Sequence, residues 1–141
     1  MQGLTAIAEH PWAYPALEAA HVVGIALLLG NLVLLELRVW GAAPALPIRP
    51  LARLALGLSL SGFGLAAITG LLMFAASPGE LLANRLFLIK MGLLFAAGLN
   101  AAAFHARGGL DKSDAVARMQ TVLSLGLWIA VIIAGRFIAY L

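Results

Sequence analysis

The sequence predicts an all-α protein, a bundle of four antiparallel helices that cross a membrane. Of the 141 residues, 63% are hydrophobic and only 11% are charged, whereas soluble domains carry about 45–50% apolar and about 25% charged residues. A soluble fold of this length could not bury so much apolar surface. The apolar residues also form four stretches that reach the roughly 20 residues a helix needs to cross a hydrocarbon core.

Each expected span has its own boundary signals. Pro15 suits the first turn of a helix, Pro78-Gly79 stops the second span, and Gly108-Gly109 ends the third. The links between the spans are short, which predicts an up-down-up-down order in a single domain covering residues 1–141. The expected spans are 15–39, 50–76, 84–106 and 115–141.

The distribution of Lys and Arg predicts the orientation. Cytoplasmic links carry an excess of these residues. Six of the nine flank the first and third links: Arg38, Arg49, Arg53, Arg107, Lys112 and Arg118. We therefore expect these two links in the cytoplasm and both termini on the periplasmic or outer side.

Small residues recur every fourth position in the first two spans, which predicts close contact between helix backbones in lipid. The two rows are Ala16, Ala20 and Gly24, and Gly62, Ala66 and Gly70.

The candidate functional residues are the polar side chains inside the spans, which are costly in lipid and usually face the bundle interior. Depth and helical angle place His21, Lys90 and Arg136 in one outer layer, with Glu18 just above it. A second layer near the midplane holds Asn31 and Asn100. A third layer, near the cytoplasmic end, holds Glu36, Arg38, Arg53 and His105.

Of these residues, His21 is the one whose position inside the membrane most needs a chemical explanation. Its imidazole either bonds to Glu18 or serves a cofactor or metal. A neutral imidazole is a good axial ligand for haem iron, and Lys90 and Arg136 could hold the haem carboxylates. His10 is the one histidine that could join His21 as a second ligand. Small residues on the second span were expected to leave room for a flat ring: Gly62, Gly64, Ala66 and Ala67.

Purely structural interpretations of the same residues stay open. Lys90 and Arg136 could extend their stems to the interface. Glu18 and Glu36 could pair with Arg136 and Arg38 to fix helix register. The two asparagines, Asn31 and Asn100, could bond between helices.

Several motifs resemble known membrane families. The stretch from Asn84-Arg85 to Lys90, followed by Asn100, resembles the G-R-x-L-x-x-K…N helix of the copper-resistance CopD family. Thr69-Gly70-Leu71 is similar to the T-G-L that ends the preceding CopD helix.

The first span, with His21, Gly30 and Leu37-Arg38-Val39, is similar to that of the HemJ-type protoporphyrinogen oxidases. That resemblance implies four helices, haem b, and key roles for a first-helix histidine and a third-helix lysine, here His21 and Lys90. The chain also resembles an uncharacterised bacterial family of four-helix membrane proteins.

We therefore expect a multi-pass protein of the bacterial inner membrane that binds haem b and takes part in redox chemistry. His21 would ligate the iron, Lys90 and Arg136 would hold anionic groups, and Glu18 would orient His21. An oxidoreductase with a membrane or periplasmic redox partner is one form of this hypothesis. The alternatives are a CopD-type copper protein, with metal at His21 and His10, and a structural subunit of a larger complex. A homo-oligomer is compatible with all three, and the net charge of +3 gives no reason to expect nucleic acid.

Overall fold

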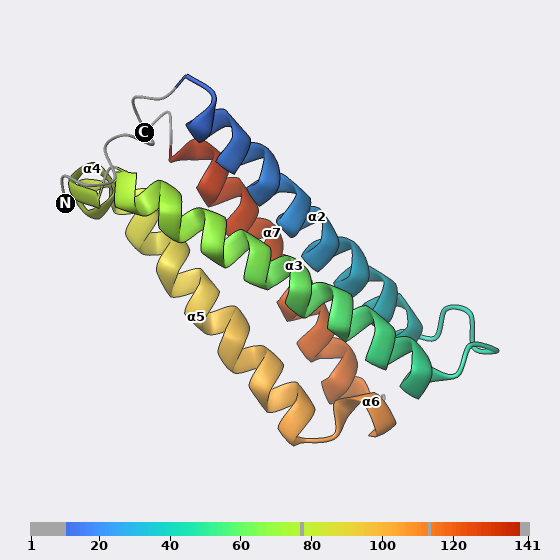
Figure 1. Cartoon of the computed structure of the whole chain (residues 1–141). Coiled ribbons are helices and arrows are strands. Elements are labelled where there is room, and N and C mark those ends of the chain that lie inside the picture. Colours follow the sequence, from blue (N-terminus) through green and yellow to red (C-terminus); the bar gives the residue numbers. More distant parts are fainter. Residues whose placement is uncertain (1–10, 77, 113, 139–141) are drawn as a thin grey trace.

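The computed structural model describes residues 11–76, 78–112 and 114–138, and within them the prediction of an all-α bundle is confirmed. Four of its helices are long and apolar enough to cross a membrane. The helices are α2 (Ala13–Val39), α3 (Ile48–Ala76), α4 (Pro78–Ala83), α5 (Arg85–Ala106), α6 (Gly109–Lys112) and α7 (Ala115–Phe137). The start of α2, the end of α7 and α4 lie at one end of the bundle, named the α4 end; α6 and the α2–α3 link lie at the other, the α6 end (Figure 1).

The predicted span boundaries agree with these helices to within two residues wherever both ends are described. The fourth span was predicted to reach residue 141, but residues 139–141 lie outside the described part of the chain. Two short helices were missed. The short link before the third span contains α4, and the short link before the fourth contains α6.

Helices α2 and α3 pack along a seam of small residues. A Cβ atom on Gly24 would lie 2.7 Å from the Gly62 carbonyl oxygen and 2.8 Å from the Ala66 nitrogen. Deeper in the seam, the Ser59 hydroxyl donates to the Leu28 carbonyl oxygen at 3.2 Å. The predicted close approach is therefore found at Gly24, the last residue of the first row, and at Gly62 and Ala66 of the second row, and the two helices run in opposite directions.

The outermost member of the first row, Ala16, is exposed. That position of the predicted row therefore does not belong to the seam.

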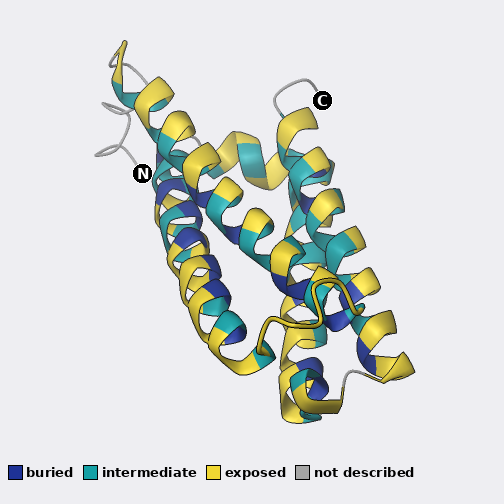
Figure 2. Ribbon diagram, turned by 90° about the vertical axis from the view of Figure 1, so that its right-hand side faces the viewer, coloured by how far each residue is buried: buried dark blue, intermediate teal, exposed yellow. Residues whose placement is uncertain are grey.

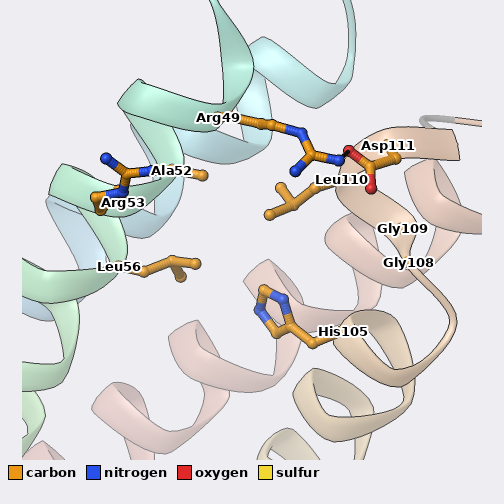
Figure 3. Close-up of a pocket in the computed structure, with 9 residues that line it drawn as sticks. All are labelled: Arg49, Ala52, Arg53, Leu56, His105, Gly108, Gly109, Leu110 and Asp111. Atoms are coloured by element: carbon orange, nitrogen blue, oxygen red, sulfur yellow. Dashed lines mark ion pairs between the residues drawn. The ribbon is translucent and has the colours of Figure 1, made fainter.

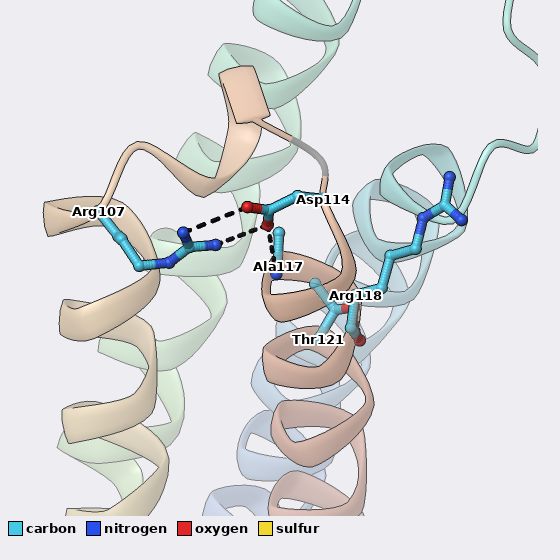
Figure 4. A network of polar contacts seen from close by, with 5 residues as sticks. All are labelled: Arg107, Asp114, Ala117, Arg118 and Thr121. Atoms are coloured by element: carbon cyan, nitrogen blue, oxygen red, sulfur yellow. Dashed lines mark hydrogen bonds and ion pairs between the residues drawn. The ribbon is translucent and has the colours of Figure 1, made fainter.

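Helices α5 and α7 form the second antiparallel pair. The Asn100 amide donates to the Gln120 carbonyl oxygen at 2.8 Å, and Phe104 packs with Ala117 in one buried cluster. At the α6 end, Arg107 pairs with Asp114 at 2.7 Å, and Asp114 also accepts from the Ala117 amide as the N-cap of α7 (Figure 4). The Arg107 guanidinium and this amide hold the pKa of Asp114 at about 2, below its ordinary 3.8.

The two pairs meet through α2 and α7. At the α6 end, the Trp40 indole donates to the Thr121 hydroxyl, and Val39 packs in the cluster with Phe104 and Ala117. At the α4 end, the rings of Phe74 in α3 and Phe87 in α5 stack 5.6 Å apart.

Exposed residues line the outside of the bundle along its whole length (Figure 2). Large side chains from three different helices stand outward, including Leu60, Phe95 and Met119, which are 70%, 71% and 70% exposed. Small residues such as Ala97 and Ala117 fill the interior, both with no exposed surface. Such a surface needs lipid around it, so the chain is a multi-pass membrane protein.

Candidate functional site

His21 lies in the α2–α3 seam, and its partner there is a threonine. The Nδ1 atom of His21 is 2.9 Å from the Thr69 hydroxyl oxygen, which itself donates to the Leu65 carbonyl oxygen at 2.8 Å. Because the hydroxyl hydrogen is used on the carbonyl, the threonine oxygen accepts from Nδ1–H. In the neutral imidazole this assignment leaves Nε2 with its lone pair.

Two glycines make space for the side chains of this region. A Cβ atom on Gly70 would lie 3.4 Å from Cε1 of His21, and one on Gly135 would lie 3.2 Å from Nζ of Lys90. The Lys90 ammonium is close enough to the His21 ring to interact with it electrostatically. His21, Thr69, Lys90 and Gly135, from four different helices, are called the His21 layer below.

The other two members predicted for this layer differ from expectation. Thr69, rather than Glu18, orients the His21 ring, and the Glu18 side chain is exposed. Arg136 follows Gly135 directly in α7 and is also exposed, although it makes an interaction of its own. The sequence analysis placed Glu18 one turn before His21 but did not place Thr69 of α3 opposite the ring.

At Gly62 and Ala66, two of the four small residues expected to leave room for a flat ring, the space is filled by α2. A Cβ on Gly62 would meet the Gly24 carbonyl oxygen at 2.5 Å, and Ala66 is buried against the same helix. The α2 backbone therefore occupies the faces of Gly62 and Ala66. Gly64 is different, because a Cβ there would meet no described atom within 4 Å.

The two asparagines act within their own pairs of helices. The Asn31 amide donates to the Leu27 carbonyl oxygen one turn earlier in α2, at 2.7 Å. The Asn100 amide donates to the backbone of α7. Asn100 therefore bonds between helices, as the structural interpretation predicted, whereas the Asn31 bond stays within α2.

Metal ligands are sparse in the part of the chain that the structure describes. It contains no group of three or more His, Asp and Glu side chains that could hold a metal ion. His10, the expected second ligand, lies outside the described residues. His21 is therefore the one predicted metal ligand whose position is known.

A second polar region lies at the α6 end, where the sequence analysis placed a layer but no site. A cavity of about 320 Å³, named the end cavity, opens between α3 and the α5–α6 segment (Figure 3). His105 projects into it from α5, and Arg49 reaches across from α3 to pair with Asp111 at 2.9 Å. Arg53 also lines it.

Beside the end cavity lies a smaller space of about 50 Å³, the interior cavity, which is enclosed by all four long helices. Glu36 lines it and is only 4% exposed. Arg38 does not pair with Glu36, as one interpretation of the sequence had it, because its Nε atom donates to the Leu46 carbonyl oxygen at 2.8 Å. The signal for this site was a single Glu in an apolar stretch near the end of the first span.

Comparison with family models, with curated proteins and with solved structures found no match for this chain. The resemblance to CopD and HemJ-type proteins therefore stays a prediction based on short motifs. What the protein does has to be inferred from its own residues.

Proposed function

We propose that this multi-pass membrane protein binds haem b at the His21 layer and takes part in electron transfer. The hydrogen bond from His21 Nδ1 to Thr69 carries the proposal, because it fixes the ring in the tautomer whose Nε2 can ligate iron. Lys90 supplies a cation in the same layer, of the kind that pairs with haem carboxylates. The motif resemblance to HemJ-type proteins points to the same two residues.

In this proposal each residue of the region has a separate task. His21 would ligate the haem iron, and Thr69 keeps its ring oriented. Lys90 binds a carboxylate inside the bundle, and Arg136 binds one at the exposed end of α7. Haem, when bound, supplies one-electron chemistry, and the substrate would be a tetrapyrrole or a quinol, with a membrane or periplasmic partner as electron acceptor.

The test is an absorption spectrum of the purified protein, produced with added haem precursor and then titrated with haemin. We expect a Soret band that His21→Ala abolishes and that Lys90→Ala weakens. His105→Ala is the matched control, because it removes a histidine at the opposite end of the bundle and should leave the band unchanged. A wild-type protein that stays colourless and binds no haemin would overturn the proposal.

The same hydrogen bond also favours a second candidate, a non-catalytic structural subunit. A histidine that donates to Thr69 across the seam is explained by helix packing alone. In that case His21→Ala and Thr69→Val would lower the stability of the purified protein by similar amounts, and no pigment would be found. The haem proposal instead requires Thr69→Val to retain a Soret band with an altered position or affinity.

Copper binding is the remaining alternative, and the same samples test it. Of the two predicted copper ligands, His21 and His10, only His21 lies among the described residues, and these contain no group of three or more His, Asp and Glu side chains that could hold a metal ion. Metal analysis that finds stoichiometric copper, lost in His21→Ala and in His10→Ala, would replace haem by copper.

A further inference from the structure

The interior cavity holds a carboxyl group that the proposed haem site does not use. Glu36 projects from α2 into this space, which Asn100 of α5 and Gln120 and Ser124 of α7 also line. Ser124 contacts the Glu36 carboxyl group through a side-chain hydrogen bond. With 4% exposure, Glu36 is the most deeply enclosed acidic side chain of the described residues.

No cation faces this carboxyl group. Among the described residues that line the interior cavity there is no Lys or Arg, and the one other titratable side chain is His105 of α5. The charged groups of α3 and α6, Arg49, Arg53 and Asp111, line the end cavity instead. An ionised carboxylate that is buried at this depth without a neighbouring cation is strongly unfavourable, and such a group is neutralised by taking up a proton.

The hydrogen bonds of the interior cavity also favour a proton on Glu36. Two buried oxygens, Oε2 of Glu36 and Oε1 of Gln120, have no hydrogen-bond partner among the described atoms. Both are acceptors when Glu36 is ionised, so neither can satisfy the other. A proton on Glu36 converts one carboxyl oxygen into a donor, which can then reach an acceptor directly or through water. The cavity of about 50 Å³ has room for about one or two water molecules, at about 30 Å³ each in the liquid.

We propose that Glu36 is a proton-binding site inside the membrane, and that its proton is exchanged with the α6 end through His105 and the end cavity. His105 and Leu56 line both cavities, so the two spaces are neighbours with the imidazole at their boundary. His105 is itself exposed, and a histidine can accept a proton on one nitrogen and release one from the other. Toward the α4 end, the close Gly24–Gly62 contact leaves no comparable opening in the α2–α3 seam.

The proton on Glu36 can be observed directly by infrared spectroscopy of the protein in lipid nanodiscs. A protonated carboxylic acid has a C=O stretching band that is separate from the amide and carboxylate bands and that shifts in deuterated water. We expect this band at neutral pH in the wild type, its loss in Glu36→Gln, and its retention in Glu18→Gln, an exposed carboxyl on the same helix. A spectrum without a Glu36-dependent acid band at or below neutral pH would overturn the proposal.

Two further experiments distinguish a bound proton from a bound metal cation and test the path by which the proton reaches Glu36. If Na⁺ neutralised Glu36, the band would disappear when NaCl replaces choline chloride at constant pH, and that result would reject proton binding. For the route, the rate at which the band responds to deuterated water should fall several-fold in His105→Phe and stay unchanged in Glu18→Gln. Equal rates in His105→Phe and wild type would refute access through His105. None of these readouts depends on haem, so they stand apart from the test of the His21 layer.

Discussion

The α2–α3 seam predicts opposite behaviour for two glycines that are half a turn apart on α3. A Cβ atom on Gly62 would lie 2.5 Å from the Gly24 carbonyl oxygen and 2.7 Å from the Leu27 Cβ atom. Ordinary van der Waals contact begins at 3.4 Å, so Gly62→Ala must push the helices apart by about 0.9 Å at this point. Gly64→Ala adds the same methyl group where no described atom lies within 4 Å.

The expected free energies follow from these distances. Forcing an extra methyl group into a packed interface costs about 1–3 kcal/mol. Replacing glycine by alanine within a helix recovers up to about 1 kcal/mol, because alanine loses less backbone entropy. Gly62→Ala should therefore lower the free energy of unfolding by up to about 2 kcal/mol. Gly64→Ala should leave it unchanged or raise it by as much as about 1 kcal/mol.

Reversible unfolding in mixed micelles, with increasing mole fraction of SDS, measures both variants. Helix content from circular dichroism and the fluorescence of the three tryptophans follow the transition. Since both substitutions add one methyl group to the same helix, any general effect of alanine cancels in the comparison. If the two variants unfold at the same SDS fraction, the close α2–α3 contact described here is wrong.

Two further predictions concern the α6 end. Asp114→Asn should lower the thermal midpoint at neutral pH, because the folded-state pKa of Asp114 is depressed. Its contribution is complete above the ordinary pKa of 3.8 and is lost as the pH falls to about 2, so the midpoints of variant and wild type should converge there; a pH-independent difference would contradict this. Trp40→Phe should cost about 0.5–1.5 kcal/mol by removing the indole N–H that donates to Thr121. Thr121→Val should cost more, about 1–3 kcal/mol, because the partly buried indole N–H is left without an acceptor, and equal losses would count against the hydrogen bond.

The spans could be predicted because length and apolar composition fix them without reference to neighbouring helices. Helices α4 and α6 could not, since helices of six and four residues are too short to leave a hydrophobic period. The sequence analysis also did not predict which helices pack against each other. The sequence gives the angle of each side chain on its own helix, whereas the α2–α3 pairing depends on how two backbones fit together.

One part of that pairing did leave a signal that the sequence analysis did not use. In α3 the buried residues Ala55, Ser59, Gly62, Ala66 and Thr69 recur at alternating steps of four and three, the spacing of a helix that packs along one partner. Reading Ser59 and Thr69 as members of this row would have placed Thr69 opposite His21. Rows defined by glycine and alanine alone left out the serine and the threonine that belong to the same face of α3.

The two polar regions share a location that follows from this packing. Contacts within the α2–α3 pair are made by small residues, and the Gly24–Gly62 distances leave no volume for a ligand between those helices. The described cavities instead lie where the α2–α3 pair faces the α5–α7 pair, and Lys90 and Glu36 also lie there. Substitutions of the small residues in the α2–α3 seam, such as Gly62→Ala, should therefore change stability first. Glu36→Gln should instead remove the proposed proton site while the fold persists, because it replaces one side chain that lines a cavity by another of nearly the same shape.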